Sequence, residues 1–519
     1  MDKICIVDMG SQYTHLIARR VREVGIYSEI ISHKISIKEL KTISPKGIVL
    51  SGGPNSVYEL NSPQLSQDFF NYVEAEKIPV LGICYGLHLI IHQMGGKIEA
   101  HSLKEYGKTE LEVLVEDELF QSLDHRQIVW MSHGDQVKSL PKGFIILAKT
   151  DTCPIAAYKS QDSIFYGVQF HPEVSHTKNG MTILTNFIEK VVKAKKEWCL
   201  EDWIQDTIST VKEVVGPTNR VILGLSGGVD SSVAAILIHK AIGDRLHSIF
   251  VNNGLLRKNE EREVQEVFKE QLKFKNFHFV DAEDYFLEKL KNIVDPEEKR
   301  KIIGHSFIEI FERETIRLEK QYPDIKFLAQ GTIYPDRVET SATSNTSSKI
   351  KSHHNLTLPD NMTLKIIEPL RDLYKDEVRK IGFKLGLPKE LIQRHPFPGP
   401  GLAVRIVGQI DKEKLDILRN ADEILIEEIK NANLYDSLWQ AFCVFLPLKT
   451  TGVMGDYRTY EYICSIRIVE SLDAMTANFA KLDWDLLEKI SSRIVNEVKG
   501  INRVVYDISN KPPSTIEYE

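Results

Sequence analysis

Apolar and polar positions along residues 1–100 predict strands separated by helices. Ile4–Val7 is a short apolar run, and apolar residues then recur at helical spacing over 16–24 until Gly25 ends the pattern. Further apolar runs at 47–50 and 79–83 each lead into a glycine-bearing turn. Short continuous apolar runs bounded by turns are typical of buried parallel strands. We therefore expect an open, mostly parallel α/β sheet here.

The rest of the chain predicts two further regions. Residues 110–170 indicate shorter strands, and a lysine-rich helical pattern near 182–214 predicts a connector to a second α/β unit, which begins at Val221. This unit alternates strand and helix until the stiff run His395–Gly401 (H-P-F-P-G-P-G), which cannot be helical. A smaller α+β segment follows. The chain of 519 residues is thus expected to hold three domains, over residues 1–198, 199–394 and 395–519.

Composition excludes several classes of protein. Charged residues make up 27% and hydrophobic residues 42%, which are ordinary values for a globular chain. No apolar run approaches the ~18 residues of a membrane span, and the acidic N-terminus does not resemble a signal peptide. The net charge of −7 favours no nucleic-acid partner. The six cysteines form no CxxC pair, so we expect a reduced, cytoplasmic protein with neither a membrane nor a nucleic-acid partner.

The most specific motif is the run S-G-G-V-D-S-S after the apolar segment 221–225. A strand, a glycine turn and a helix N-terminus would together point backbone N–H groups at an anion. The loop lacks the lysine of a Walker A motif, which favours gripping a pyrophosphate over transferring a terminal phosphoryl group. The plainer interpretation is a glycine turn before an ordinary helix. The candidate ATP-binding residues are Ser226, Gly227, Gly228, Val229, Asp230, Ser231 and Ser232.

This run resembles the PP-loop of the ATP pyrophosphatases, which split ATP into AMP and pyrophosphate while adenylating a substrate. The resemblance implies a fold like that of the PP-loop adenine nucleotide α-hydrolases, with ATP as co-substrate. A departure from the family pattern is Asn252, where the family usually has Asp; Asn keeps the acceptor oxygen while losing the charge.

A second candidate site centres on Cys84, in the run G-I-C-Y-G between an apolar strand and a helical pattern. A helix N-terminus lowers the pKa of a thiol, and a thiolate nucleophile needs a base with an orienting partner. His171 and Glu173 offer both on one loop, and Gly52-Gly53 would bring backbone N–H groups to a developing oxyanion. Singly these signals are weak, because a lone cysteine after a strand more often belongs to the core.

In the order S-G-G-P, G-I-C-Y-G and H-P-E, the pattern resembles the class I glutamine amidotransferases, whose domain is flavodoxin-like. The resemblance implies that Cys84 is the nucleophile, His171 the general base and acid, and Glu173 its orienting partner. Gly53 and Tyr85 would supply oxyanion N–H groups, beside Gly52. The family usually has Gln in place of His88, and that Gln helps to hold the substrate glutamine.

Nearly the whole chain resembles the glutamine-hydrolysing GMP synthetase family, through runs such as G-T-I-Y-P-D (331–336), K-S-H-H-N (351–355) and the terminal K-P-P-S-T-I-E. The resemblance implies that ATP adenylates xanthosine 5′-monophosphate (XMP) and that ammonia then displaces AMP. It implies Mg²⁺ on Asp230, Asp336 and Glu339, and a homodimer formed through a C-terminal dimerisation domain. It assigns Lys351, His353 and His354 to a lid, and Arg300, Gln440, Lys511, Ile516 and Glu517 to XMP.

Other interpretations stay open on sequence alone. The polar stretch 340–354 is either a surface loop or a lid over phosphates. A PP-loop RNA-modifying protein would have a basic surface and paired cysteines, which the chain lacks. A binding protein without catalysis would not need Cys84, His171, Glu173 and the PP-loop together. Glutamine-dependent NAD synthetase shares the chemistry but usually has a nitrilase-type domain.

Overall fold

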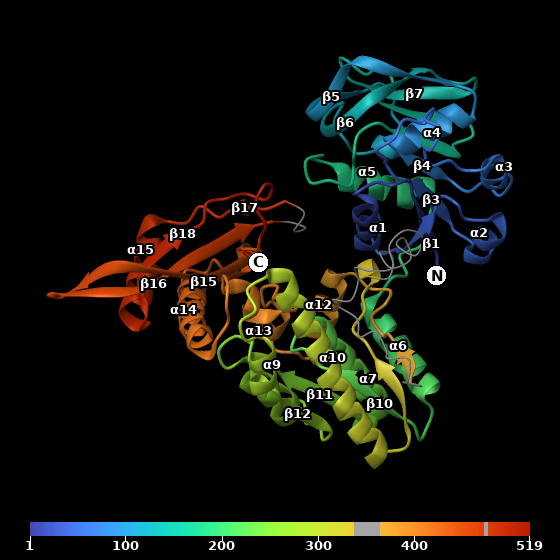
Figure 1. Ribbon diagram of the computed structural model, residues 1–519. Coiled ribbons are helices and arrows are strands. Elements are labelled where there is room, and N and C mark those ends of the chain that lie inside the picture. The colour runs from blue at the N-terminus through green and yellow to red at the C-terminus, as the bar shows by residue number, and fades with distance from the viewer. Residues whose placement is uncertain (337–363, 472–475) are drawn as a thin grey trace. The chain divides into compact units, whose positions relative to one another are not determined.

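The computed structural model describes residues 1–336, 364–471 and 476–519, and it divides into two compact units. Unit 1 is Met1–Trp203 and unit 2 is Ile204–Glu519. Each unit has its own sheet, and the expected alternation of strand and helix is present in both (Figure 1). The boundary falls inside α6 (Leu200–Val215). None of the helices in the described ranges is long and apolar enough to cross a membrane.

Unit 1 is built on a nine-stranded sheet with a parallel half and an antiparallel half. Five neighbouring strands are parallel, and the other four are joined to them by antiparallel pairings. In sheet order they are β2 (Tyr27–Ser32), β1 (Lys3–Asp8), β3 (Gly47–Leu50), β4 (Val80–Ile83), β9 (Phe165–Val168), β8 (Ala157–Ser160), β7 (Phe144–Lys149), β5 (Lys97–Val113) and β6 (Arg126–Ser139).

The neighbouring strands β3, β4 and β9 position the cysteine site. All their residues are buried, as in parallel strands covered on both faces. Because parallel strands share a carboxyl edge, the S-G-G, G-I-C-Y-G and H-P-E runs that follow them meet at one edge. The helices of this unit are α1 (Thr14–Glu23), α2 (Ile37–Ile43), α3 (Gln67–Ala75), α4 (Tyr85–Gln93) and α5 (Gly180–Asn186).

Two expectations about unit 1 were wrong in detail. The strands between 97 and 139 are long, with 17 residues in β5 and 14 in β6, because the two pair with each other in an antiparallel ladder. The helical pattern near 182–214 is not one connector: α5 ends at Asn186, a short π-helical turn runs to Val191, and α6 begins only at Leu200.

Unit 2 contains a five-stranded parallel sheet. The central strand carries the PP-loop at its carboxyl end, so both neighbouring strands deliver loops beside it. In sheet order the strands are β12 (Phe277–Asp281), β11 (Leu246–Asn252), β10 (Arg220–Gly224), β13 (Ile325–Ala329) and β14 (Lys365–Ile367). The helices are α7 (Val229–Ile242), α8 (Glu260–Gln265), α9 (Glu283–Lys289), α10 (Pro296–Gln321), α12 (Lys375–Lys384), α13 (Lys389–Ile392), α14 (Lys412–Asn431) and α15 (Trp484–Glu497).

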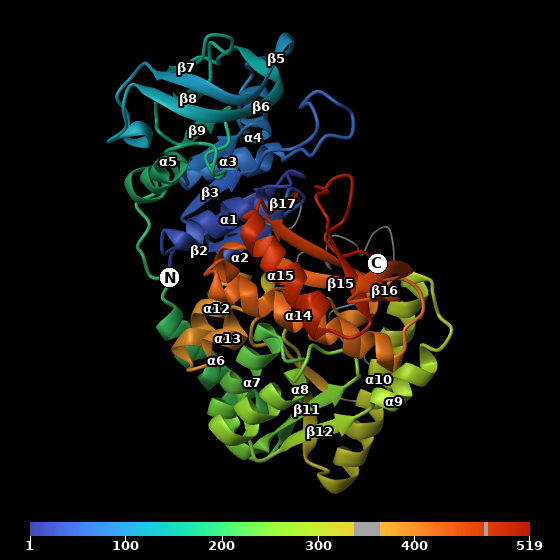
Figure 2. The same ribbon diagram turned by 90° about the vertical axis from the view of Figure 1, so that its left-hand side faces the viewer.

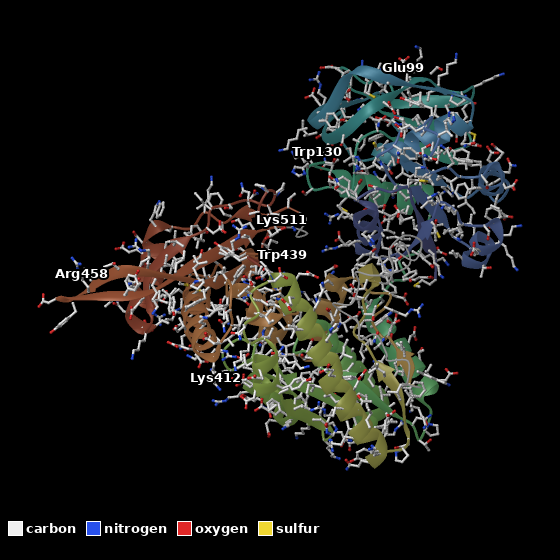
Figure 3. All side chains as sticks on the ribbon, in the orientation of Figure 1. Glu99, Trp130, Lys412, Trp439, Arg458 and Lys511 are labelled. Carbon is white, nitrogen blue, oxygen red and sulfur yellow. The ribbon has the colours of Figure 1, made fainter. Side chains whose placement is uncertain are left out.

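A second sheet forms the C-terminal part of unit 2. Its hairpin extends away from the rest of the unit, with Arg458 near the far end (Figures 1 and 3). Helix α14 packs against the hairpin and against α15 (Figure 2). Both sheets contribute to one hydrophobic core, which includes Ile249 of β11 and Ile466 of β16. The strands are β15 (Gln440–Met454), β16 (Tyr457–Glu470), β17 (Asn478–Phe479) and β18 (Ile501–Tyr506).

Candidate functional sites

Cys84 occupies a strained elbow between β4 and α4. Its φ of 51° and ψ of −103° lie in a region that non-glycine residues rarely adopt, and such strain clusters at functional sites. The flanking glycines make the elbow possible. A Cβ on Gly82 would lie 2.5 Å from the backbone of Gly86, and a Cβ on Gly86 would lie 2.5 Å from the carbonyl of Leu50. The spacing G-x-C-x-G is therefore a steric requirement of this turn.

His171 is buried beside the thiol and is oriented by Glu173. The His171 Nδ1 atom lies 2.7 Å from Glu173 Oε1. Thr177 Oγ1 donates to the His171 carbonyl over 2.6 Å, which helps to fix the loop. Burial acts to lower the pKa of His171, but the Glu173 carboxylate and the hydrogen bonds with Cys84 and Glu173 hold it well above its usual value. This arrangement favours a protonated imidazole beside the Cys84 sulfur.

Gly52 and Gly53 line the space next to this pair. A Cβ on Gly52 would lie 3.2 Å from His171 Cε1 and 3.8 Å from Cys84 Cβ. A Cβ on Gly53 would lie 2.6 Å from the Met9 carbonyl. Tyr85, the first residue of α4, packs against Gly53, and the first N–H groups of a helix have no partner within it. All the residues expected at the amidotransferase site are therefore brought together.

Sequence reasoning missed Gln169. It lies two residues before His171, and its run F-Y-G-V-Q-F indicated only the end of a strand. The Gln169 side chain is fully buried; its Nε2 donates to Cys84 Sγ over 3.7 Å, and its Oε1 lies 2.7 Å from His88 Nε2. Burial lowers the pKa of His88 to about 4, so its ring is neutral at physiological pH.

A buried polar cluster lies close to this site. Glu105, His133 and Cys153 have side-chain atoms within 4.8 Å of one another, the one such group of possible metal ligands in the described ranges. The His133 ring lies 3.0 Å from the Glu105 carboxylate, which also accepts from Thr150 over 2.9 Å. Burial raises the pKa of Cys153 to about 12, which keeps its thiol protonated. We read the cluster as a hydrogen-bonded link between strands.

The PP-loop forms the compact turn that the sequence predicts. Gly227 has a φ of +74°, and the Ser231 hydroxyl accepts from the Ser226 N–H over 3.2 Å. A Cβ on Gly331, just after β13, would lie 3.1 Å from the Ser231 nitrogen, so that glycine lets the two loops approach. Residues 226–232 thus form the turn before α7 and its first turn, where backbone N–H groups and the helix dipole favour phosphate.

The candidate magnesium ligands are only partly described. The Asp230 Oδ2 atom pairs with Lys375 Nζ of α12, whereas Asp230 Oδ1 is buried without a partner in the described part of the chain. The Asp336 Oδ2 atom accepts from the Ile333 N–H over 3.1 Å. Glu339 and the expected lid residues Lys351, His353 and His354 lie outside the described residues. The orphaned carboxylate oxygen fits a hard cation bridging to phosphate oxygens.

Asn252 holds the loop beside the PP-loop. Its Oδ1 accepts from the Gly254 N–H over 3.1 Å, and its Nδ2 donates to Asp281 over 3.1 Å. The amide therefore satisfies one acceptor role and one donor role, whereas an Asp at this position would face another carboxylate.

The C-terminal tail gathers several expected XMP residues. Gln440 Nε2 donates to Glu517 Oε1 over 2.7 Å, and Arg405 forms a two-pronged pair with the same carboxylate at 3.0 and 3.1 Å. Ile516 is buried against Phe442 and its neighbours. Arg300 donates to the backbone carbonyl of the last residue, Glu519. The fifth expected residue, Lys511, pairs through its backbone with Ala477; Figure 3 marks its position.

Family models match three parts of the chain. The model for class-I glutamine amidotransferases matches residues 5–191, the NAD synthase model matches 199–302, and the model of the GMP synthase C-terminal domain matches 427–518. The second match covers the PP-loop. The third match is to a domain named for GMP synthases, whereas the second is to a model named for NAD synthases.

Full-length relatives decide the family. The glutamine-hydrolysing GMP synthase of Brachyspira hyodysenteriae is 52% identical, covering 100% of this chain and 99% of its own. The chain belongs to the glutamine-hydrolysing GMP synthases. The member from Thermosipho melanesiensis is 53% identical, with both chains covered completely. A solved glutamine amidotransferase from Thermotoga maritima is 17% identical and covers 37% of this chain and 99% of its own, with a TM-score of 0.31. As a member of this family the chain is a glutamine-using, ATP-dependent ligase with an α/β amidotransferase region, a PP-loop region and a GMP synthase C-terminal region.

Proposed function

We propose that the two units divide the reaction of a glutamine-hydrolysing GMP synthase between them. Unit 1 hydrolyses glutamine to glutamate and ammonia. Unit 2 uses ATP to adenylate an oxygen of XMP, releasing pyrophosphate, and ammonia then displaces AMP to form GMP. The observation that carries the proposal is the buried thiol–imidazole–carboxylate arrangement, in which His171 Nδ1 lies 2.7 Å from Glu173 Oε1 and the His171 ring and Cys84 both border Gly52.

In unit 1, we assign each step of hydrolysis to a residue of this arrangement. The Cys84 sulfur attacks the glutamine amide carbon, and His171, holding the thiol proton, gives it to the departing ammonia. His171 then removes a proton from water, which attacks the thioester carbon; the C–S bond breaks, glutamate leaves, and His171 returns the proton to the Cys84 sulfur. Glu173 stabilises the imidazolium each time it forms. The N–H groups of Gly53 and Tyr85 are assigned to the oxyanion.

In unit 2, the PP-loop is assigned to the phosphates of ATP. Its backbone N–H groups and the serine hydroxyls would hold the pyrophosphate that leaves. Mg²⁺ is assigned to Asp230 and Asp336, with Glu339 as the third carboxylate; when bound, it would neutralise phosphate charge. The unpartnered Asp230 Oδ1 supports this assignment.

We assign XMP to the region where the C-terminal tail meets α10 and β15. Arg300 and Lys511 suit its phosphate, and Gln440 with the tail backbone suits its polar groups. Replacing Arg300→Met should raise the KM for XMP by at least about tenfold, since a charged hydrogen bond is lost. The exposed neighbour Lys301→Met is the matched control. Unchanged XMP kinetics in Arg300→Met would reject this assignment.

The main test separates the two units. Cys84→Ala should abolish glutamine-dependent synthesis of GMP and leave synthesis from added ammonium intact. Loss of both activities would contradict the division of labour. The product should be AMP with pyrophosphate; ADP with phosphate would contradict the PP-loop assignment. Deamido-NAD offered in place of XMP should give no product, which distinguishes NAD synthetase.

We further propose a homodimer formed through the C-terminal domain, with domain limits at residues 1–198, 199–394 and 395–519. Exposed apolar side chains on the hairpin and β18 support it: Leu448, Val453, Tyr457, Tyr460 and Val505. Tyr460→Glu should convert the dimer into a monomer in sedimentation experiments, whereas Tyr106→Glu, at an equally exposed tyrosine of unit 1, should not. A Tyr460→Glu variant that stays dimeric would place the interface elsewhere.

All six cysteines are free, and we infer a cytoplasmic location from this reduced state.

A further inference from the structure

A chain of three buried side chains leads from α4 to the reactive sulfur. His88 Nε2 lies 2.7 Å from Gln169 Oε1, and Gln169 Nε2 lies 3.7 Å from Cys84 Sγ. His88 is 4% exposed and Gln169 is 0% exposed, so water does not compete for these contacts. Neither contact is part of the Cys84–His171–Glu173 arrangement.

The orientation of the Gln169 amide determines whether a hydrogen-bond donor or an acceptor faces the Cys84 sulfur. With its oxygen toward His88, the amide turns its NH₂ group toward Cys84, where it is a donor. A donor stabilises a thiolate, whereas an acceptor such as the Ser132 carbonyl, 3.7 Å away, stabilises only the thiol. The amide orientation therefore favours one ionisation state of the nucleophile.

His88 is suited to hold this orientation because it is neutral. Burial lowers its pKa, the nearby His133 adds to that effect, and the Gln169 hydrogen bond and Asp135 oppose it without reversing it. A neutral imidazole protonated on Nε2 donates to the Gln169 oxygen and adds no charge near the thiolate. A charged group at this depth would perturb the site.

We propose that His88 is a positioning residue that holds Gln169 so that its amide N–H stabilises the Cys84 thiolate. This rests on the proposed role of Cys84 as the nucleophile. The groups that set the charge at the sulfur are then His171 with Glu173 on one loop and Gln169 from the same edge of the sheet. His88 acts through Gln169.

The test measures the thiol itself. Iodoacetamide alkylation of Cys84 is followed across pH by mass spectrometry of the peptide, with the half-buried Cys199 as an internal control. Gln169→Leu should move the midpoint of the profile to higher pH by about one unit, the scale of one hydrogen bond to a charged group. His88→Leu should give a similar shift. His88→Gln should keep the wild-type profile, because the amide of the new glutamine can also donate to the Gln169 oxygen.

The double variant decides between a relay and a direct role. If His88 acts only through Gln169, His88→Leu combined with Gln169→Leu shifts the profile no further than Gln169→Leu alone. Additive shifts, or a Gln169→Leu profile that matches the wild type, would overturn the proposal. The proposal would also fail if His88→Leu raised the KM for glutamine by the same factor in the wild type and in Gln169→Leu. Such a result would indicate that His88 contacts the substrate directly.

Two controls distinguish a failure of the His88–Gln169 proposal from misfolding and from a failure of the proposed function. All variants should still melt cooperatively, at a lower temperature where a buried polar group loses its partner, and ammonium-dependent GMP synthesis should be unchanged, which excludes misfolding as the cause of a shift. The profile is measured on the thiol and needs no glutaminase activity. If Cys84→Ala keeps glutamine hydrolysis, the proposed function fails while the alkylation profile still reports whether Gln169 contacts the sulfur.

Discussion

Lys375 at the start of α12 forms an ion pair with Asp230 of the PP-loop. The loop lacks the lysine of a Walker A motif. Instead, a lysine from a distant segment of the chain lies beside it. Lys375 is half-exposed, and we expect it to contact phosphate oxygens when ATP is bound. The pair therefore connects the anion cradle to α12.

Lys375→Met should raise the KM for ATP about tenfold or more, because a charge-assisted contact to phosphate is lost. Glutamine hydrolysis without nucleotide should stay unchanged. Lys380→Met, at an exposed lysine on the same helix, is the matched control and should keep the wild-type KM. If both variants have the same ATP kinetics as the wild type, Lys375 serves only to neutralise Asp230.

His395 makes stability depend on pH. Burial lowers its pKa to about 4, and its ring stacks on Tyr435 while Nδ1 accepts from the Ala441 N–H over 3.2 Å. The unfolded chain, with a pKa near 6.5, binds the proton first as the pH falls. Stability is thus full above about pH 6.5 and falls toward pH 4, by roughly 2 kcal/mol at pH 5 from this residue.

Urea unfolding at pH 7.5 and pH 5 measures this loss. His395→Gln should reduce the difference between the two pH values, whereas His305→Gln, at an exposed histidine, should leave it unchanged. An identical pH difference in wild type and His395→Gln would show that the other buried histidines, including His88 and His247, account for the acid sensitivity.

Local patterns were enough for the reactive segments but not for their partners. Cys84 could be predicted because an apolar strand, two close glycines and a helical pattern all lie within ten residues. Gln169 and Lys375 could not, because one looked like part of a strand end and the other like an ordinary surface lysine. Their importance comes from the sheet order, which places β9 beside β4 and brings α12 to the PP-loop. Such long-range pairings leave no periodic signal in a single sequence.

The last residue of the chain neutralises a buried lysine. Lys299 is 0% exposed; its Nζ pairs with the Glu519 carboxylate and donates to the Ile406 carbonyl over 2.9 Å. Glu519→Ala should lower the free energy of unfolding of unit 2 by about 3–5 kcal/mol, since it leaves a buried charge without its partner. Lys299→Met in the same background should recover much of this loss. Urea unfolding followed by tryptophan fluorescence measures both.

The matched control is an exposed pair of the same unit. Glu423→Ala breaks the surface ion pair with Lys258 and should cost less than about 1 kcal/mol. Equal losses in Glu519→Ala and Glu423→Ala would contradict the burial argument. Removing all residues after Asn510 would also delete Glu519, so the unfolding of unit 2 would mask any effect on XMP binding.

The glutaminase site has no room for a side chain at position 52. A Cβ there would lie 3.2 Å from His171 Cε1, so the ring must shift relative to Cys84. Gly52→Ala should therefore lower kcat/KM for glutamine by roughly 10- to 100-fold, because small misplacements of a catalytic base are costly. Ammonium-dependent synthesis should be unaffected. Gly304→Ala in α10, where a Cβ would meet nothing within 4 Å, should leave both activities intact. A Gly52→Ala enzyme with wild-type glutaminase kinetics would mean that the His171 ring has room to move without losing its alignment with the thiol.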